Sequence, residues 1–127
     1  MPSRRLLLFT KPAREGRVKT RLIGDLTAAQ AAALHSAFLD DLLDRLREGD
    51  FDLCLAWDLD AADEMPAGPV SGIRQQGDDL GERLYRALAE SAEEAMSVMA
   101  LGSDHPSLPL AIIHEAFDRL EQAAEVV

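Results

Sequence analysis

Short apolar segments alternate with longer helical segments along this chain, and that alternation constrains its fold more than any other feature. The predicted strands are four apolar segments, at 4–10, 51–58, 73–75 and 98–101. The predicted helices repeat apolar residues at three- and four-residue spacing, and they span 27–48, 79–92 and 109–120. Residues 123–127 read as the start of a fifth strand. The order β-α-β-β-α-β-α-(β) predicts an α/β fold with a mostly parallel sheet covered by helices on both faces.

The predicted helices carry signals at their ends and on their faces. Thr27 and Gln30 have the spacing of a capping box, and Gly49 ends the helix that follows. The pair Asp78-Asp79 suits the start of the second helix, where a carboxylate caps free backbone N–H groups. On that helix we expect a buried stripe formed by Leu80, Leu84, Leu88 and Ala92. On the last helix the expected buried residues are Ile112, Ile113, Ala116, Phe117 and Leu120.

The length of 127 residues predicts one domain, 1–127, with a core of its own. The single cysteine, Cys54, excludes an internal disulfide and suits a reducing compartment. We expect it to be a small core residue on the face of its strand opposite Trp57. The longest apolar run near the start, 6–9, is too short for a signal peptide or a membrane span. We therefore expect a cytoplasmic protein with no membrane partner.

Charge is distributed very unevenly. Residues 1–21 hold seven basic side chains and one acid, a net of +6, whereas the other 106 residues hold six basic and twenty-two acidic side chains, a net of −16. The overall charge of −10 speaks against a nucleic-acid partner and an anionic membrane surface. A small basic island on an acidic body instead favours a compact anion such as a nucleotide phosphate.

The basic island is concentrated in the loop after the first strand. Five cations fall within eleven residues there, around Gly16, and they are Lys11, Arg14, Arg17, Lys19 and Arg21. A bound phosphate would relieve their mutual repulsion, and lysine and arginine both suit phosphate oxygens. The alternative is a solvated basic loop without a ligand. The loop is not a Walker A motif, because Val18 and Ala13 stand where that motif needs glycine. We expect the Lys19 side chain to be exposed.

Asp104 follows the fourth predicted strand in the segment Gly102-Ser103-Asp104-His105-Pro106. A carboxylate at a strand end suits Mg²⁺ or Mn²⁺, which are usually held by one or two carboxylates plus substrate phosphates. The alternative is that Asp104 only caps the turn. A second acidic pair, Asp58 and Asp60, has the D-x-D spacing of a metal motif and lies in an acid-rich loop. His35 and His114 are expected at surface or boundary positions, and His105 in a solvent-facing turn.

Three groups of residues together resemble a known family. They are Phe9-Thr10-Lys11 with Gly16-Arg17-Val18-Lys19-Thr20-Arg21-Leu22, then Gly77-Asp78-Asp79-Leu80-Gly81-Glu82-Arg83, then Gly102-Ser103-Asp104-His105-Pro106. In this order and spacing they resemble the small bacterial GT-A-type glycosyltransferase-like proteins of the nucleotide-diphospho-sugar transferase superfamily. Members occur beside radical-SAM enzymes, and some are assigned to arsenosugar biosynthesis. The resemblance covers essentially the whole chain.

The resemblance implies a Rossmann-like nucleotide-binding sheet and assigns roles to the quoted residues. The loop after the first strand would bind the phosphates of a nucleotide or nucleotide-sugar, through Lys11, Arg14, Gly16, Arg17, Lys19 and Arg21. Gln76, Asp79 and Gly81 would lie near the nucleoside. Asp104 would hold Mg²⁺ or Mn²⁺ at the diphosphate, and metal and cations would stabilise charge on the leaving group. No individual catalytic residue is implied.

Family members continue for another half-domain, which this sequence lacks. The expected fold is therefore truncated after the start of the fifth strand, with an open sheet edge that a second copy of the chain could complete. Two alternatives to glycosyl transfer stay open, because nucleotidyltransferases share this fold and a basic first loop and because half of the implied site is missing. One is nucleotidyl transfer from a nucleoside triphosphate, and the other is a non-catalytic nucleotide-binding or assembly module.

Overall fold

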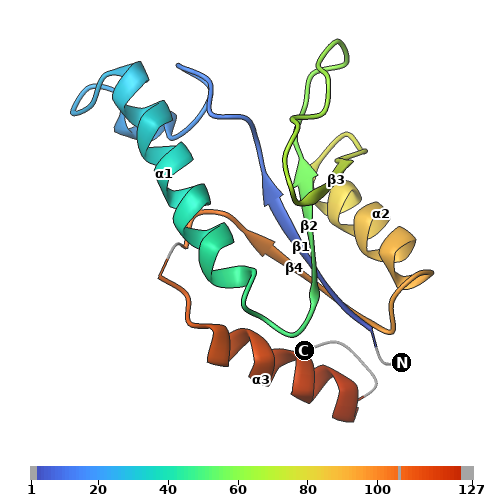
Figure 1. The fold of residues 1–127 in the computed structure, drawn as a ribbon. Helices are drawn as coiled ribbons and strands as arrows, with labels where there is room; N and C mark the ends of the chain where they lie inside the picture. Colours follow the sequence, from blue (N-terminus) through green and yellow to red (C-terminus); the bar gives the residue numbers. More distant parts are fainter. Residues whose placement is uncertain (1–2, 106, 124–127) are drawn as a thin grey trace.

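The computed structural model describes residues 3–105 and 107–123, and these form a parallel sheet with helices packed on it (Figure 1). In chain order the elements are β1 (Arg4–Thr10), the short 3₁₀ helix η1 (Thr20–Leu22), α1 (Ala28–Leu46), β2 (Asp52–Trp57), β3 (Ser71–Arg74), α2 (Leu80–Ala92), β4 (Ser97–Gly102) and α3 (Leu110–Ala123). The predicted Rossmann-like α/β fold is confirmed, with the four described strands where the sequence places them.

The strands lie in the order β3-β2-β1-β4, and every pairing is parallel. From β1 the chain moves outward to β2 and β3, and α2 then returns it to β4 on the other side of β1. Because all strands run the same way, their carboxyl ends meet at one edge of the sheet. The reversal between β1 and β4 is the kind of switch point at which ligands bind in open α/β sheets.

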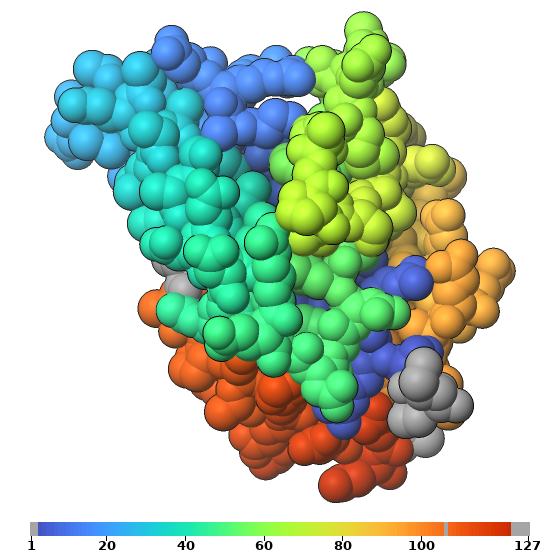
Figure 2. Space-filling view, in the orientation of Figure 1, coloured from blue at the N-terminus to red at the C-terminus, as the bar shows by residue number. Residues whose placement is uncertain are grey.

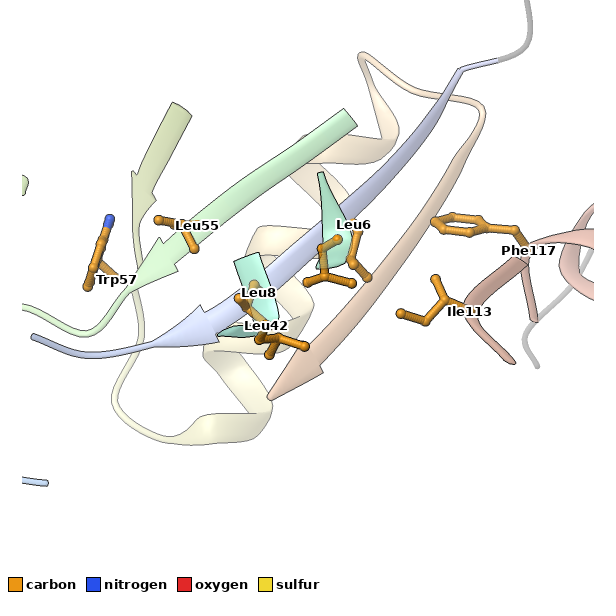
Figure 3. Packing of buried hydrophobic residues seen from close by; sticks show 8 residues of the cluster. Leu6, Leu8, Leu42, Leu55, Trp57, Ile113 and Phe117 are labelled. Atoms are coloured by element: carbon orange, nitrogen blue, oxygen red, sulfur yellow. The ribbon is translucent and has the colours of Figure 1, made fainter. Parts of the chain in front are cut away.

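Side chains of β1 alternate between two apolar layers, so the strand is buried on both faces. Leu6 and Leu8 point to one face and Leu7 to the other, and none of the three is exposed to solvent. On the first face they join the cluster drawn in Figure 3, with Leu42 and Leu46 of α1 and Ile113 and Phe117 of α3. On the second face Leu7 packs with Cys54 of β2 and Ala87 of α2. Full burial of one such aliphatic side chain contributes roughly 1.5–3 kcal/mol to the stability of the fold. The buried central strand therefore gives the loops at its carboxyl end a stable base.

Two helices begin at the caps that the sequence indicates. The Thr27 hydroxyl accepts a hydrogen bond from Gln30 N, and the Gln30 side chain accepts one from Thr27 N, which forms the predicted capping box of α1. The Asp79 carboxylate caps α2 by accepting from Glu82 N at 2.8 Å. Cys54 is buried on the face opposite Trp57, as predicted.

The buried faces of the later helices differ from the predicted ones. On α2 the stripe over 80, 84, 88 and 92 is wrong at both ends, since Leu80 is 64% exposed and Ala92 is exposed too. The fully buried positions are instead Ala87 and Ser91. Residues spaced by four drift about 40° per step around a helix, and this carries Ala92 away from the face of Ala87 and Ser91. Leu80 lies on that face but in the first turn of α2, where it lines the pocket. On α3 the prediction fails at Ile112, which is 51% exposed.

The predicted fifth strand, 123–127, overlaps the end of α3 at residue 123. Ala123 is the last residue of that helix, not the first residue of a strand, and 124–127 lie outside the described residues. Within the described part of the chain β4 pairs only with β1 and is an edge strand. None of the helices described here is long and apolar enough to cross a lipid bilayer.

Candidate functional site

A pocket of about 520 Å³ opens at the carboxyl edge of the sheet. The residues that line it come from the ends of all four strands, the loop after β1, the third turn of α1 and the start of α2: Phe9, Thr10, Lys11, Lys19, Thr20, Arg21, His35, Asp58, Gln75, Leu80, Gly102, Ser103 and Asp104. Figure 2 shows the loops after β1 and β2, blue and green, reaching the same end of the molecule. The volume lies in the range of pockets that take small-molecule ligands.

The floor of the pocket is a chain of hydrogen bonds that ties β1, β4 and α1 together. Ser103 Oγ donates to Thr10 Oγ1 at 3.0 Å, and Thr10 Oγ1 lies 3.5 Å from His35 Nε2. His35 Nε2 also lies 2.9 Å from the carbonyl oxygen of Lys11, which can only accept, so Nε2 carries the proton. All three side chains are buried. The first peptide of the basic loop is therefore fixed to the turn that precedes Asp104.

A second network, around Arg83 of α2, closes the opposite side of the pocket. Arg83 donates to Asp58 Oδ1 at 2.8 Å, to Gln75 Oε1 at 3.3 Å and to the Gly77 carbonyl at 3.0 Å. Gln75 Nε2 donates in turn to the carbonyl oxygens of Ala56 and Thr10. Gln75 thus spans the ends of β1 and β2, and its amide is fully engaged by protein.

Lys19 has the most unusual environment of the loop cations. Its side chain is only 5% exposed, so the prediction of an exposed lysine is wrong. The backbone of Lys19 adopts the left-handed conformation, with φ 48° and ψ 41°, just before η1, and this turns the side chain inward. Its ammonium lies 4.6 Å from the centroid of the Phe38 ring on α1 and 3.2 Å from Asp104 Oδ1. A left-handed non-glycine residue costs about 1–2 kcal/mol, which the surrounding contacts have to offset.

Asp104 is half exposed at the mouth of the pocket, with 56% of its side chain accessible. Partial burial acts to raise the pKa of its carboxyl, but the hydrogen bond from Lys19 and the charges of Lys19, Arg21 and His35 outweigh it. The net result is a pKa below the ordinary value of 3.8. The carboxylate is therefore ionised at neutral pH and, beside its contact with Lys19, faces solvent.

The five loop cations separate into two groups. Lys11, Lys19 and Arg21 line the pocket, and Lys11 and Arg21 are exposed and make no ion pair within the described part of the chain. The other two point to the loop after β2. Arg14 pairs with Asp63 at 2.9 Å, and Arg17 pairs with Asp60 at 3.0 Å.

The acidic loop therefore relieves the repulsion among the loop cations, a role that the sequence suggested for a bound anion. The hydrogen bond from Arg14 lowers the pKa of Asp63, which keeps this pair charged. Gly16 lies between the two arginines with φ 74°, a conformation suited to glycine, and it does not line the pocket.

The residues expected near the nucleoside lie at the rim or outside the pocket. Gln76 is exposed and does not line it, whereas its neighbour Gln75 does. Asp79 is used as the cap of α2, and Gly81 lies exposed in the first turn of that helix. Leu80 is the residue of this segment that lines the pocket, and its apolar side chain is exposed to solvent there.

The carboxylates do not form a ready metal cage. Asp58 and Asp60, the D-x-D pair, point to different partners, Arg83 and Arg17. Within residues 3–105 and 107–123 no three His, Cys, Asp or Glu side chains come together as a metal-binding group. The donor set at Asp104 therefore fits only an ion that takes most of its ligands from water and phosphate oxygens, as Mg²⁺ commonly does.

Sequence reasoning missed several residues that build this pocket. His35 was expected at a surface or boundary position but is 5% exposed beneath the pocket. Its signal was available, since it follows the capping box on the same helix stripe as the buried residues Ala31 and Leu42. Asp58 was considered only as part of the D-x-D pair, and nothing in the sequence indicated its pairing with Arg83. His105 is exposed, as predicted, and His114 accepts a hydrogen bond from Asp50 N.

Comparisons with known proteins agree with this architecture. Residues 39–127 match the family described as "Uncharacterized protein conserved in bacteria (DUF2064)". The fold matches the crystal structure of a "putative nucleotide-diphospho-sugar transferase" from Desulfovibrio desulfuricans G20, with a TM-score of 0.87 and 30% sequence identity. That match covers 95% of this chain and 55% of the other, so the chain spans just over half of that protein's length. The search of curated proteins found no match.

Proposed function

Because the chain belongs to the bacterial family DUF2064 and has the fold described above, we propose that its pocket binds the diphosphate of a nucleotide-diphospho-sugar and that the chain acts in glycosyl transfer. The observation that carries the proposal is the pair Lys11 and Arg21. Both are exposed cations at the switch point of the sheet, and neither makes an ion pair with a described residue. Unpaired cations converging on a pocket favour an anionic ligand.

The composition of the pocket matches the parts of such a ligand. Lys11, Lys19 and Arg21 are on the side of β1 and β4, where phosphate oxygens would find donors. Leu80, exposed at the start of α2, offers an apolar surface to the nucleoside. Asp58, held by Arg83, adds a hydrogen-bond acceptor to the pocket lining. A cavity of about 520 Å³ accommodates a ligand of nucleotide size.

Asp104 is the residue that would hold a divalent cation. Its carboxylate is ionised and half exposed at the pocket mouth, which suits Mg²⁺ or Mn²⁺ that is otherwise coordinated by water and by the ligand's phosphates. Such an ion would neutralise negative charge that develops on a departing diphosphate. The protein's own contribution is a set of three cations at the pocket, Lys11, Lys19 and Arg21, which would stabilise that charge electrostatically without a covalent intermediate.

Calorimetric titration with UDP, GDP and the matching triphosphates, with and without Mn²⁺, tests this proposal. We expect one diphosphate to bind, and to bind more tightly with Mn²⁺. Binding of triphosphates only, with pyrophosphate released on turnover, would favour nucleotidyl transfer instead. Failure of every nucleotide to bind would contradict the proposal.

The matched variants Arg21→Gln and Arg17→Gln locate the binding site. Both remove one positive charge from the same loop, but only Arg21 lines the pocket, whereas Arg17 pairs with Asp60. Arg21→Gln should weaken diphosphate binding about tenfold, the value of one charge-assisted hydrogen bond, while Arg17→Gln leaves it within about twofold. Equal losses in the two variants would mean that the loop acts only through its overall charge.

A further inference from the structure

Lys19 is a buried cation held in a strained backbone conformation, and its partners explain why it is there. A buried ammonium is costly unless it is paired, and Lys19 has two partners on different elements. The Phe38 ring lies 4.6 Å from its ammonium, and Asp104 Oδ1 lies 3.2 Å away. Left-handed backbone at a lysine (φ 48°) is the sort of local strain that collects at functional sites. The fold therefore holds this ammonium against one particular carboxylate.

That carboxylate is the one to which the proposed function assigns a divalent cation. A divalent cation held by Asp104 would lie close to the ammonium of Lys19, because that ammonium contacts the same carboxylate. Two cations at such a distance repel each other strongly, because the partly buried site screens them less than bulk water does. Lys19 and a metal ion thus compete for Asp104 as long as no other negative charge is present.

The charges around the pocket reinforce this competition. Three cations line it, Lys11, Lys19 and Arg21, against two carboxylates, and one of these, Asp58, is already paired with Arg83. Addition of a divalent cation alone would raise an existing positive excess. A diphosphate reverses the balance, because its oxygens give the ammonium of Lys19 alternative partners and supply ligands for the metal.

Resting on the proposed function, we propose that Lys19 makes the pocket selective for a metal–nucleotide complex over the free metal ion. In the ligand-free chain its ammonium neutralises Asp104 and keeps divalent cations away. When the diphosphate is bound, the carboxylate becomes available to the metal. By thermodynamic linkage, nucleotide raises the affinity for metal by the same factor by which metal raises the affinity for nucleotide.

Measurement of Mn²⁺ affinity by electron paramagnetic resonance, without nucleotide and then with saturating UDP or GDP, tests the inference. Lys19→Met removes the ammonium but keeps an unbranched side chain against Phe38. It should bind free Mn²⁺ about tenfold or more tightly than the unaltered chain, and the nucleotide-linked gain should shrink by the same factor. Arg17→Met is the matched control, and its Mn²⁺ affinity should stay unchanged because Arg17 does not line the pocket and its partner Asp60 keeps Arg14 at 3.8 Å. Unchanged or weaker binding of free Mn²⁺ to Lys19→Met would overturn the inference.

Two further variants separate this inference from the proposed function. Lys19→Gly also removes the ammonium and suits the left-handed backbone, so it gives the same test if Lys19→Met does not fold. Asp104→Asn should abolish the gain in Mn²⁺ affinity in either Lys19 variant. If Asp104→Asn abolishes nucleotide-linked Mn²⁺ binding and neither Lys19 variant raises the affinity for free Mn²⁺, the inference fails and the metal assignment stands. If Asp104→Asn has no effect on Mn²⁺ binding in any background, both fail.

Discussion

Replacement of His35 tests how the basic loop is attached to the sheet. His35 is 5% exposed, and its Nε2–H donates to the carbonyl oxygen of Lys11 at 2.9 Å. His35→Leu removes that donor and leaves the carbonyl, together with the hydroxyl of Thr10, without a partner on α1. His35→Gln is the conservative counterpart, since its amide nitrogen can donate from a similar distance along the side chain.

The magnitude follows from the partly buried position of this hydrogen bond. A lost hydrogen bond that leaves a buried acceptor unsatisfied costs about 1–3 kcal/mol, and the Lys11 carbonyl is only partly buried. We therefore expect His35→Leu to lower the free energy of unfolding by about 1–2 kcal/mol. Because Lys11 begins the loop that lines the pocket, nucleotide affinity should fall as well. His35→Gln should restore most of both losses.

Urea unfolding, monitored by circular dichroism, gives the free energy of unfolding of each variant. Calorimetric titration with the diphosphate that binds gives its nucleotide affinity. Stability measured first ensures that the affinity is compared among folded variants. The reasoning is refuted if His35→Leu unfolds at the same urea concentration as the unaltered chain. It is refuted equally if His35→Gln is as damaged as His35→Leu, because the lost property would then be the shape of the imidazole and not its donor.

Three other predictions follow from the fold and the pocket. Glu121 accepts hydrogen bonds from Arg4, and these lower the pKa of the Glu121 carboxyl below 4.5 in the folded protein. The ionised carboxylate therefore stabilises the fold at pH values above the pKa of the unfolded chain, and this stabilisation is lost as pH falls through the pKa of the folded protein. Glu121→Gln should therefore lower stability at pH 7 and reduce the loss of stability between pH 7 and pH 3, as measured by urea unfolding. Phe117→Ala should lower the free energy of unfolding by about 3–5 kcal/mol in the same assay, since the ring is fully buried. Leu80→Ala should change stability by less than about 0.5 kcal/mol, because the side chain is exposed, yet weaken nucleotide binding in calorimetry; unchanged affinity would remove Leu80 from the site.

The parts of the fold that the sequence predicted well are those set by local chemistry and periodicity. The continuous apolar run of β1 and the capping box at Thr27 need no knowledge of distant residues, and both are confirmed. The burial of Cys54 follows from the alternation of side chains along a strand. The buried stripe of α2 was wrong at its ends, because four-residue spacing identifies a helix face but does not show that Leu80, in the first turn, lines the pocket or that Ala92 drifts off the buried face.

The candidate site depended on contacts that sequence spacing does not encode. The sequence identified the basic loop and Asp104, but which cations face the pocket is decided by partners 43 to 85 residues away, such as Asp60 and Asp104 itself. The inward turn of Lys19 depends on a single left-handed residue that no motif predicted. Gln75, not Gln76, lines the pocket, since neighbouring side chains at a strand end point in opposite directions.

Paramagnetic broadening tests the central claim most directly, because it locates the bound metal–nucleotide complex on the chain. ¹⁵N-labelled protein would be titrated with the diphosphate that binds, first with Mg²⁺ and then with traces of Mn²⁺. We predict that Mn²⁺ broadens the amide signals of the pocket, those of Lys11, Thr20 and Asp104 among them. Broadening centred instead on the acidic hollow of α1, around Asp41, Asp44 and Glu48, with the pocket signals unaffected, would contradict the account.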